Sequence, residues 1–124
     1  MDPGLVPAAG VDAWSRTDVM VVLAAQSALA HAGLRDPGSD LALAVGGTTG
    51  GMLEAEGIFL GDSGLAPEQA ARRLLSYPLS TPLERLATEL RTRGRSASVC
   101  SACSSGANAI LLGAGWIEHG RASR

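Results

Sequence analysis

Residues 96–111 read Ser-Ala-Ser-Val-Cys-Ser-Ala-Cys-Ser-Ser-Gly-Ala-Asn-Ala-Ile-Leu. The first six of these residues are uncharged and small or β-branched, and they predict a short buried strand. From Ser104 to His119 apolar residues recur with a helical period, and Gly120 predicts the end of that helix. A strand that turns directly into a helix is a building unit of α/β folds. Cys103 lies at this turn.

The helix that follows Cys103 carries an apolar stripe. The stripe consists of Ala107, Ile110, Leu111, Ala114 and Ile117. Gly113 and Gly115 lie within the same helix, where each glycine costs about 1 kcal/mol relative to alanine. Their presence predicts that another backbone packs directly against this helix.

Upstream, the sequence predicts one further strand and four helices. We expect the strand over 41–45 and the helices over 17–32, 52–60, 67–75 and 81–93. Ser15 and Asp18 have the spacing of a helix-capping pair. Thr81, Pro82 and Glu84 predict a second capping box, with threonine as the N-cap.

This alternation of helices and strands predicts an α/β fold with parallel strands. Residues 1–14 contain prolines and glycines without a period, so we expect an irregular lead-in followed by a domain over 15–124. Two strands are fewer than a stable sheet usually needs. The order of the elements also predicts another strand after the last helix. We therefore expect part of a domain rather than a complete one.

Composition excludes several classes of protein. The chain has 124 residues, 46% of them hydrophobic, and a net charge of −2, which indicates a single small globular domain. This balance is not that of a nucleic-acid-binding protein. No apolar run reaches the ~18–20 residues of a membrane helix, and the first residues lack the basic region of a secretory signal. We expect a cytoplasmic protein that binds neither nucleic acid nor membrane.

Cys103 is the candidate nucleophile. The first backbone N–H groups of a helix have no partner within the helix, and together with the helix dipole they favour a thiolate at this turn. Ser104, Ser105 and Gly106 are small and leave room for an acyl chain to approach. A lone cysteine is more often a small packing residue. Position alone therefore does not distinguish catalysis from packing.

Cys100 and Cys103 also have the Cys-x-x-Cys spacing of redox proteins. In thioredoxin-like proteins the first cysteine begins the helix, whereas the helix here begins after the second. Two cysteines are too few for a zinc site. We expect neither a redox pair nor a metal site, and we interpret Cys100 as a small buried residue of the strand.

Two further segments have a structural interpretation. The glycine-rich stretch 46–51 lacks the lysine of a P-loop and the G-x-G-x-x-G spacing, which favours a tight turn with close backbone contacts. Arg91, Arg93 and Arg95 form a small basic cluster, which we interpret as a solvated helix end.

The segment 101–110, Ser-Ala-Cys-Ser-Ser-Gly-Ala-Asn-Ala-Ile, resembles the active-site elbow of β-ketoacyl synthases, the condensing enzymes of fatty-acid and polyketide synthesis. Three other blocks are similar to segments that precede the elbow in this family. Block 16–34 is similar to the family's helix before the first of these strands, and block 41–52 is similar to the family's strand with its glycine-rich loop. Block 81–101 is similar to the helix and strand that lead into the nucleophile. The resemblance implies a partial thiolase-like fold.

The resemblance also implies a reaction. Cys103 would accept an acyl group from the phosphopantetheine of an acyl carrier protein, and the carbanion left by decarboxylation of a malonyl unit would attack the resulting thioester. No metal or organic cofactor is implied, and the full-length form would be a homodimer. Met52 and Leu53 would lie beside the acyl pocket. Carrier proteins are acidic, so one could dock on the arginine cluster at 91–95.

The chain departs from the family in one respect. Members place two histidines and a lysine in the second half of the enzyme for decarboxylation and enolate stabilisation. Here His31 and His119 lie at helix ends, where we interpret them as C-terminal capping residues. We expect acylation but not condensation from this chain alone. The alternatives are a non-catalytic thiolase-fold partner or remnant that serves dimerisation, and a thiolase that acts on acyl-CoA.

Overall fold

The computed structural model describes residues 14–61 and 63–124, so nearly all of the expected lead-in lies outside the described residues. The elements are α1 (Arg16–His31), β1 (Leu43–Gly46), α2 (Met52–Phe59), α3 (Pro67–Leu74), α4 (Thr81–Glu89), β2 (Ser96–Val99), the 3₁₀ turn η3 (Ala102–Ser104) and α5 (Ser105–Glu118). The expected alternation of helices and strands is confirmed.

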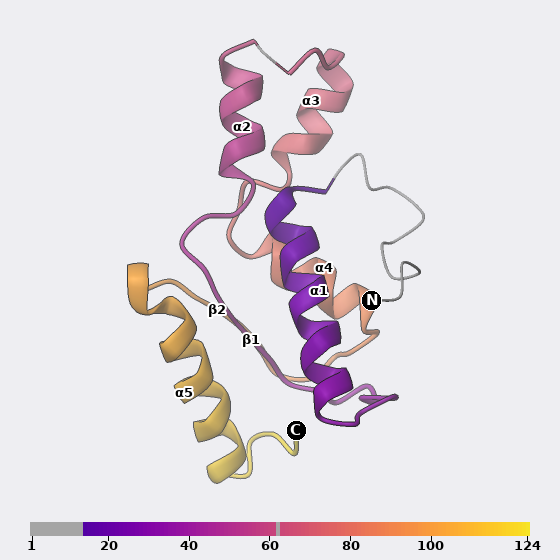
Figure 1. Ribbon diagram of the computed structural model, residues 1–124, viewed down its shortest axis with the longest axis vertical. Coiled ribbons are helices and arrows are strands. Elements are labelled where there is room, and N and C mark those ends of the chain that lie inside the picture. Colours follow the sequence, from indigo (N-terminus) through magenta and orange to yellow (C-terminus); the bar gives the residue numbers. More distant parts are fainter. Residues whose placement is uncertain (1–13, 62) are drawn as a thin grey trace.

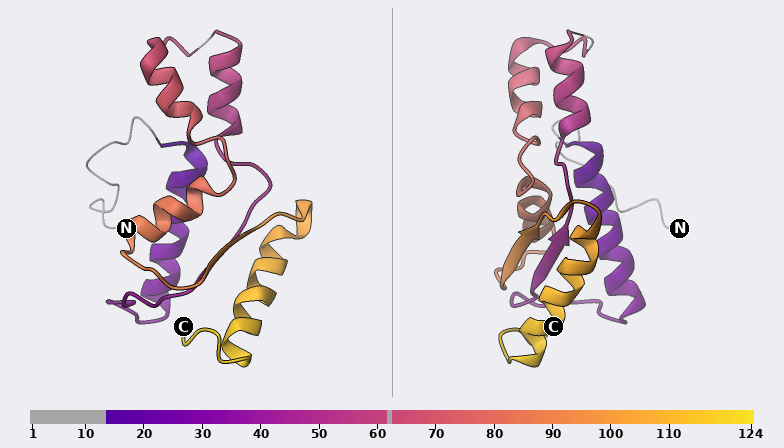
Figure 2. Two further views of the ribbon diagram at one scale, coloured as in Figure 1. Left: turned by 180° about the vertical axis from the view of Figure 1, so that it is seen from behind. Right: turned by 90° about the vertical axis from the view of Figure 1, so that its left-hand side faces the viewer.

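The two strands form the middle layer of the molecule. They run parallel, with Leu43 opposite Ser96 and Gly46 opposite Val99. Figures 1 and 2 show α5 on one face of this pair and α1 with α4 on the other. Helices α2 and α3 form a hairpin that projects beyond the sheet (Figure 1). The chain therefore crosses from β1 to β2 through three helices.

The hydrophobic core lies between α1, α4 and β1. Its buried members are Val22, Leu41, Leu43, Leu83 and Leu86. Side chains alternate along a strand, so Val45 lies on the same face of β1 as Leu43 and also packs against this core. Full burial of an aliphatic side chain of this size stabilises the fold by about 1.5–3 kcal/mol. The core thus holds the sheet against α1 and α4.

Helix α1 begins with the capping box that the sequence predicts. The Ser15 Oγ accepts the Asp18 N–H at 3.1 Å, and the Asp18 Oδ2 accepts the Ser15 N–H at 2.7 Å. Both residues are fully buried, and Arg85 of α4 forms an ion pair with the same carboxylate. The capping box therefore also ties α1 to α4.

Helix α4 ends earlier than predicted. Its last residue is Glu89, because Arg91 adopts a left-handed φ of 52°. The Thr92 N–H then donates to the Ala87 carbonyl at 3.0 Å, and the Arg91 N–H donates to the Thr88 carbonyl at 3.1 Å. These two bonds form a Schellman motif. No glycine stands at position 91 to signal this end in the sequence.

The start of α4 also differs from the prediction. Ser80 is the N-cap and makes no side-chain capping bond. Thr81 is the first helical residue, and its hydroxyl donates to the Leu75 carbonyl at 2.9 Å. The predicted capping box is therefore wrong. Thr81 instead ties α4 to the segment that follows α3.

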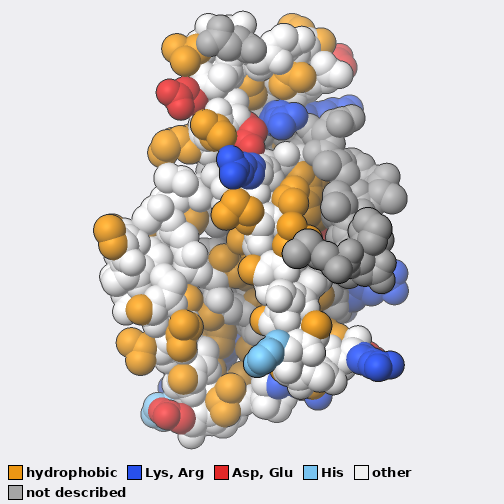
Figure 3. All heavy atoms as spheres, viewed as in Figure 1, with side chains coloured by type: hydrophobic (Ala, Val, Ile, Leu, Met, Phe, Trp, Pro, Cys, Tyr) orange, Lys and Arg blue, Asp and Glu red, His pale blue; other side chains and the backbone are white. Residues whose placement is uncertain are grey.

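Helix α5 packs on the sheet through one face and leaves its apolar stripe uncovered. Ser105, Ala109 and Trp116 are its buried residues. The stripe residues Ala107, Ile110, Leu111, Ala114 and Ile117 are all exposed, Ile110 by 74%. Figure 3 shows hydrophobic side chains gathered on this outer side of α5. Among the described residues, no helix has the length and hydropathy needed to cross a lipid bilayer.

The glycines within α5 do not mark a close backbone contact. Outside the neighbouring backbone of α5 itself, no described atom lies within 4 Å of a Cβ built on Gly113 or Gly115. The prediction of direct backbone packing at these two positions is therefore wrong. The close approach occurs at the start of α5 instead.

The last residues lie beside the start of β1. The Arg124 guanidinium donates to Asp40 at 3.0 Å and the Ser123 hydroxyl donates to it at 3.2 Å. These bonds, the one from Arg124 above all, hold the pKa of the Asp40 carboxyl below its ordinary value. The Ala42 N–H donates to the Arg124 carbonyl at 2.9 Å, so this segment contacts the edge of β1 that faces away from β2.

Candidate functional site

Cys103 lies in η3, the turn that joins β2 to α5. Its side chain is exposed and its thiol is free. Ala102, the preceding residue, has a φ of 50°, a left-handed conformation that is strained for alanine. Strain of this kind costs about 1–3 kcal/mol and persists only where the surrounding structure holds it. The strand-to-helix turn that the sequence predicts is present, and it leaves Cys103 accessible.

A network of short hydrogen bonds holds this turn. The buried Ser105 Oγ accepts the Ser101 N–H at 2.9 Å and donates to the Ala102 carbonyl at 2.7 Å. On the outer side, the Ser104 Oγ donates to the Ser101 carbonyl at 2.8 Å, and the Asn108 Nδ2 donates to the Ser101 Oγ at 2.7 Å. The bonding roles of Ser105 and Asn108 do not follow from the small size of Ser105 or from the helical pattern of the sequence. The signal was the dense run of hydroxyl side chains, which bond readily to nearby backbone groups.

Two of the amides expected to be free have partners. The Ser104 N–H donates to the Ser101 carbonyl at 3.2 Å, and the Ser105 N–H donates to the Ala102 carbonyl. The reason is that a 3₁₀ turn precedes the α-helix and uses these groups in i→i+3 bonds. The expectation of unpaired amides at 104 and 105 is therefore wrong. The positive end of the α5 dipole still lies near Cys103, two residues before the helix begins.

The end of β1 lies against the start of α5. A Cβ built on Gly46 would lie 2.7 Å from the Gly106 nitrogen and closer still to the Ser105 carbonyl group. A Cβ on Gly50 would lie 2.7 Å from the Pro78 carbonyl oxygen. The interpretation of the glycine-rich loop as a segment of close backbone contacts is confirmed at both positions. Gly46 lets the sheet set the position of the turn that carries the candidate nucleophile.

A comparison with protein-family models matches residues 6–123 to the N-terminal domain of β-ketoacyl synthases. The chain belongs to the β-ketoacyl synthase family. It matches no curated protein and no solved structure. Membership confirms the resemblance carried by the segment 101–110 and places this synthase chain among the condensing enzymes, with a partial thiolase-like fold.

The proposed acyl-pocket residues of the synthase, Met52 and Leu53, begin α2 and are 48% and 64% exposed. Met52 lines a hollow of about 200 Å³ together with Tyr77. Leu53 lines a different hollow, of about 230 Å³, together with Arg73. The linings of these two hollows do not include Cys103, so neither hollow joins α2 to the candidate nucleophile.

Cys100 of the synthase lies outside the strand. β2 ends at Val99, where it pairs with Gly46, and Cys100 is the next residue. Cys100 is exposed and free, so the prediction of a buried strand residue is wrong. The part of the chain that the structure describes contains no group of three or more metal-ligating side chains that could hold an ion.

The two histidines of the synthase chain lie at helix ends. His31 is the last residue of α1, and His119 is the C-cap of α5, with its ring Nδ1 2.7 Å from the Gly115 carbonyl oxygen. The capping role predicted for His119 is therefore confirmed. A helix of 14 residues is about 21 Å long, so His119 lies at the far end of α5 from Cys103.

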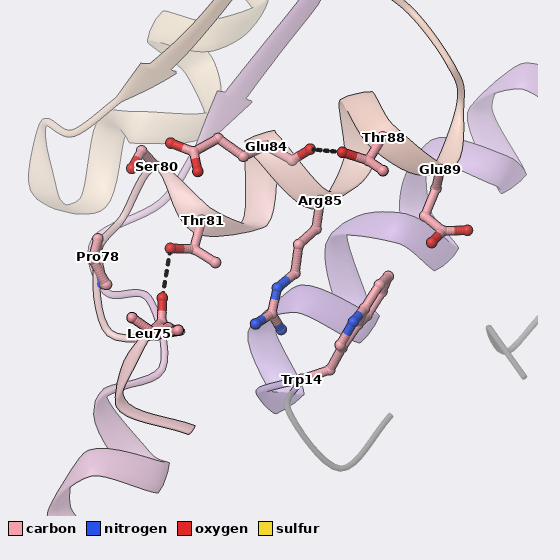
Figure 4. Close-up of a pocket in the computed structure, with 9 residues that line it drawn as sticks. All are labelled: Trp14, Leu75, Pro78, Ser80, Thr81, Glu84, Arg85, Thr88 and Glu89. Carbon is pink, nitrogen blue, oxygen red and sulfur yellow. Dashed lines mark hydrogen bonds between the residues drawn. The ribbon is translucent and has the colours of Figure 1, made fainter. Parts of the chain in front are cut away.

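A larger hollow, of about 680 Å³, lies beside α4 (Figure 4). The Arg85 guanidinium lies over the Trp14 ring at 5.4 Å from its centroid. Figure 4 shows Glu84 and Glu89 on the same helix as Arg85. The lining holds no cysteine and no histidine, so this hollow is separate from the cysteine turn of the synthase.

Proposed function

We propose that Cys103 is the acyl-accepting nucleophile of a β-ketoacyl synthase. The observation that supports this most directly is an exposed thiol on a strained strand-to-helix turn, in a chain that belongs to this family. A bulky thioester can reach a thiol only where it is accessible. The dipole of the following helix favours an anion at that end.

The proposed acyl transfer is a thioester exchange. The Cys103 thiolate attacks the carbonyl carbon of an acyl group on phosphopantetheine, and a new carbon–sulfur bond forms at Cys103. The carbon–sulfur bond to phosphopantetheine breaks, and the released thiolate takes up the proton that Cys103 gave to solvent. Cys103 acts as the covalent catalyst, and we propose no metal or organic cofactor.

The condensation step belongs to the complete enzyme in this proposal. The malonyl unit loses CO₂, and the electron pair of the broken bond attacks the carbonyl carbon of the Cys103 thioester. A carbon–carbon bond forms and the Cys103 thiolate leaves. His31 and His119 stand at helix ends, and the sequence contains no lysine, so this chain supplies acylation alone.

The proposed partner is an acidic acyl carrier protein of fatty-acid or polyketide synthesis. Arg91, Arg93 and Arg95 are exposed near the end of α4 and offer it a basic docking surface. Arg95 also lies over the Trp116 ring of α5, 5.7 Å from its centroid. We propose that the full-length synthase acts as a cytoplasmic homodimer.

Alkylation by iodoacetamide at neutral pH tests the nucleophile. We expect Cys103 to be labelled faster than Cys100, with the two sites separated by peptide mass mapping. Cys100→Ser should retain the fast reaction and Cys103→Ser should abolish it. Octanoyl-N-acetylcysteamine should add one octanoyl group, at Cys103. Equal slow labelling of both thiols without an acyl adduct would favour the non-catalytic remnant.

A further inference from the structure

Ser105 lies directly beneath the turn that carries Cys103. We propose that Ser105 is a positioning residue, whose buried hydroxyl holds Ala102 in its left-handed conformation and thereby fixes the Cys103 thiol at the start of α5. This inference rests on the proposed nucleophilic role of Cys103.

The Ser105 hydroxyl makes two hydrogen bonds to the backbone of the turn. Its oxygen accepts the Ser101 N–H at 2.9 Å and donates to the Ala102 carbonyl at 2.7 Å. These two backbone groups lie on either side of the Ala102 φ torsion. One hydroxyl therefore spans the torsion that is strained at 50° and resists its relaxation to a negative value.

Burial makes this hydroxyl hard to replace. Ser105 is only 3% exposed, so water does not readily occupy the place of its hydroxyl if that group is removed. The Ser101 N–H would then lose its hydroxyl partner, and the Ala102 carbonyl would keep only the bond from the Ser105 N–H. The Ser105 backbone is itself held in place, because the Gly46 Cα lies against its carbonyl group. The brace thus connects the end of β1 to the turn. Because Gly46 lies against the Ser105 backbone, a shift of Ser105 cannot compensate for the loss of its hydroxyl.

The outer side of the turn does not provide an equivalent brace. The Ser104 hydroxyl and the Asn108 amide bond to the Ser101 carbonyl and hydroxyl, and neither reaches a backbone group of Ala102 in the bonds described. Ser104 is exposed, so water can take its place. Among these side chains, Ser105 therefore provides the brace.

The experiment measures the rate of Cys103 alkylation relative to that of Cys100 in the same 124-residue chain. Ser105→Ala should lower this ratio roughly 3- to 10-fold, the equivalent of one net hydrogen bond. Ser105→Thr, which keeps the hydroxyl, should restore the ratio. Ser98→Ala is the matched control, because the Ser98 hydroxyl makes only a 3.4 Å contact to the Leu79 carbonyl, outside the turn. It should leave the ratio unchanged.

A second variant separates positioning from general loss of structure. Val22→Ala weakens the core on the other side of the sheet. Circular dichroism measures the loss of helicity in this variant and in Ser105→Ala, so that the two can be compared. A Val22→Ala variant that lowers the ratio as much as Ser105→Ala, at equal helicity, would overturn the proposal. So would an unchanged ratio in Ser105→Ala while wild-type Cys103 reacts faster. A wild-type ratio of one would instead overturn the proposed function, and this inference with it.

Discussion

Two residues other than glycine adopt a left-handed backbone in the described part of the chain, Ala102 and Arg91. In each case hydrogen bonds close to the residue hold the conformation. At Ala102 the Ser105 hydroxyl bonds to both sides of the torsion. At Arg91 the two Schellman bonds close the last turn of α4. The first conformation shapes the candidate active site, and the second only ends a helix.

Arg91 is therefore the better place to relieve strain without touching the cysteine turn. Arg91→Gly should stabilise the protein by about 1 kcal/mol, because glycine adopts a φ near 52° without the steric penalty of a Cβ. The shift of the urea midpoint measures this gain. Arg93→Gly is the control, since Arg93 is not among the residues with positive φ. An equal gain in both variants would contradict the explanation.

At the scale of elements, the contact between β1 and α5 decides where the cysteine turn stands. The end of β1 reaches the first turn of α5 because Gly46 has no side chain. Ser105, which braces the turn from below, is one of the residues in that contact. The distance between β1 and α5 therefore also sets the position of Cys103.

Gly46→Ala tests this contact. The added methyl group would collide with backbone atoms rather than flexible side chains, so we expect a loss of about 1–3 kcal/mol. Thermal unfolding followed by circular dichroism measures it.

The control for Gly46→Ala is Gly57→Ala, within α2. There a Cβ meets no described atom within 4 Å outside the neighbouring backbone of α2 itself, and we expect a gain of about 0.4–1 kcal/mol. If Gly46→Ala were as stable as Gly57→Ala, the close approach of β1 and α5 would be wrong.

At the scale of the whole molecule, α5 is covered on one side only. Its inner face packs on the sheet, whereas Ile110, Leu111 and Ile117 are 74%, 69% and 54% exposed on the outer face. No charged residue precedes Glu118 in this helix. An uncharged apolar surface of this kind promotes association.

We expect the 124-residue chain to self-associate through this face. Replacement of Ile110, Leu111 and Ile117 by glutamine should shift sedimentation velocity profiles toward the monomer while the far-ultraviolet circular dichroism keeps its helical signal. Met20→Gln with Leu23→Gln on α1, where the side chains are 57% and 46% exposed, is the control. Equal association of the wild type and the α5 variant would contradict this prediction.

Local signals in the sequence predicted most elements and part of the site. The Ser15 and Asp18 capping box, the glycine end of α5, and the strand-to-helix turn at Cys103 all depend on residues within a few positions of one another. Caps and periodicity act over that range, so the order of elements could be predicted from the sequence. The elbow segment together with the three blocks that precede it was also enough to indicate the family.

Tertiary contacts decided the rest. Which face of α5 is buried depends on the sheet beneath it, and the sequence pattern does not distinguish the faces because both carry apolar residues. Met52 and Leu53 line hollows apart from Cys103, because α2 projects with α3 beyond the sheet (Figure 1). The role of Ser105 depends on Gly46, a residue far away in the chain. Contacts between distant segments leave no local pattern, so only the folded structure reveals them.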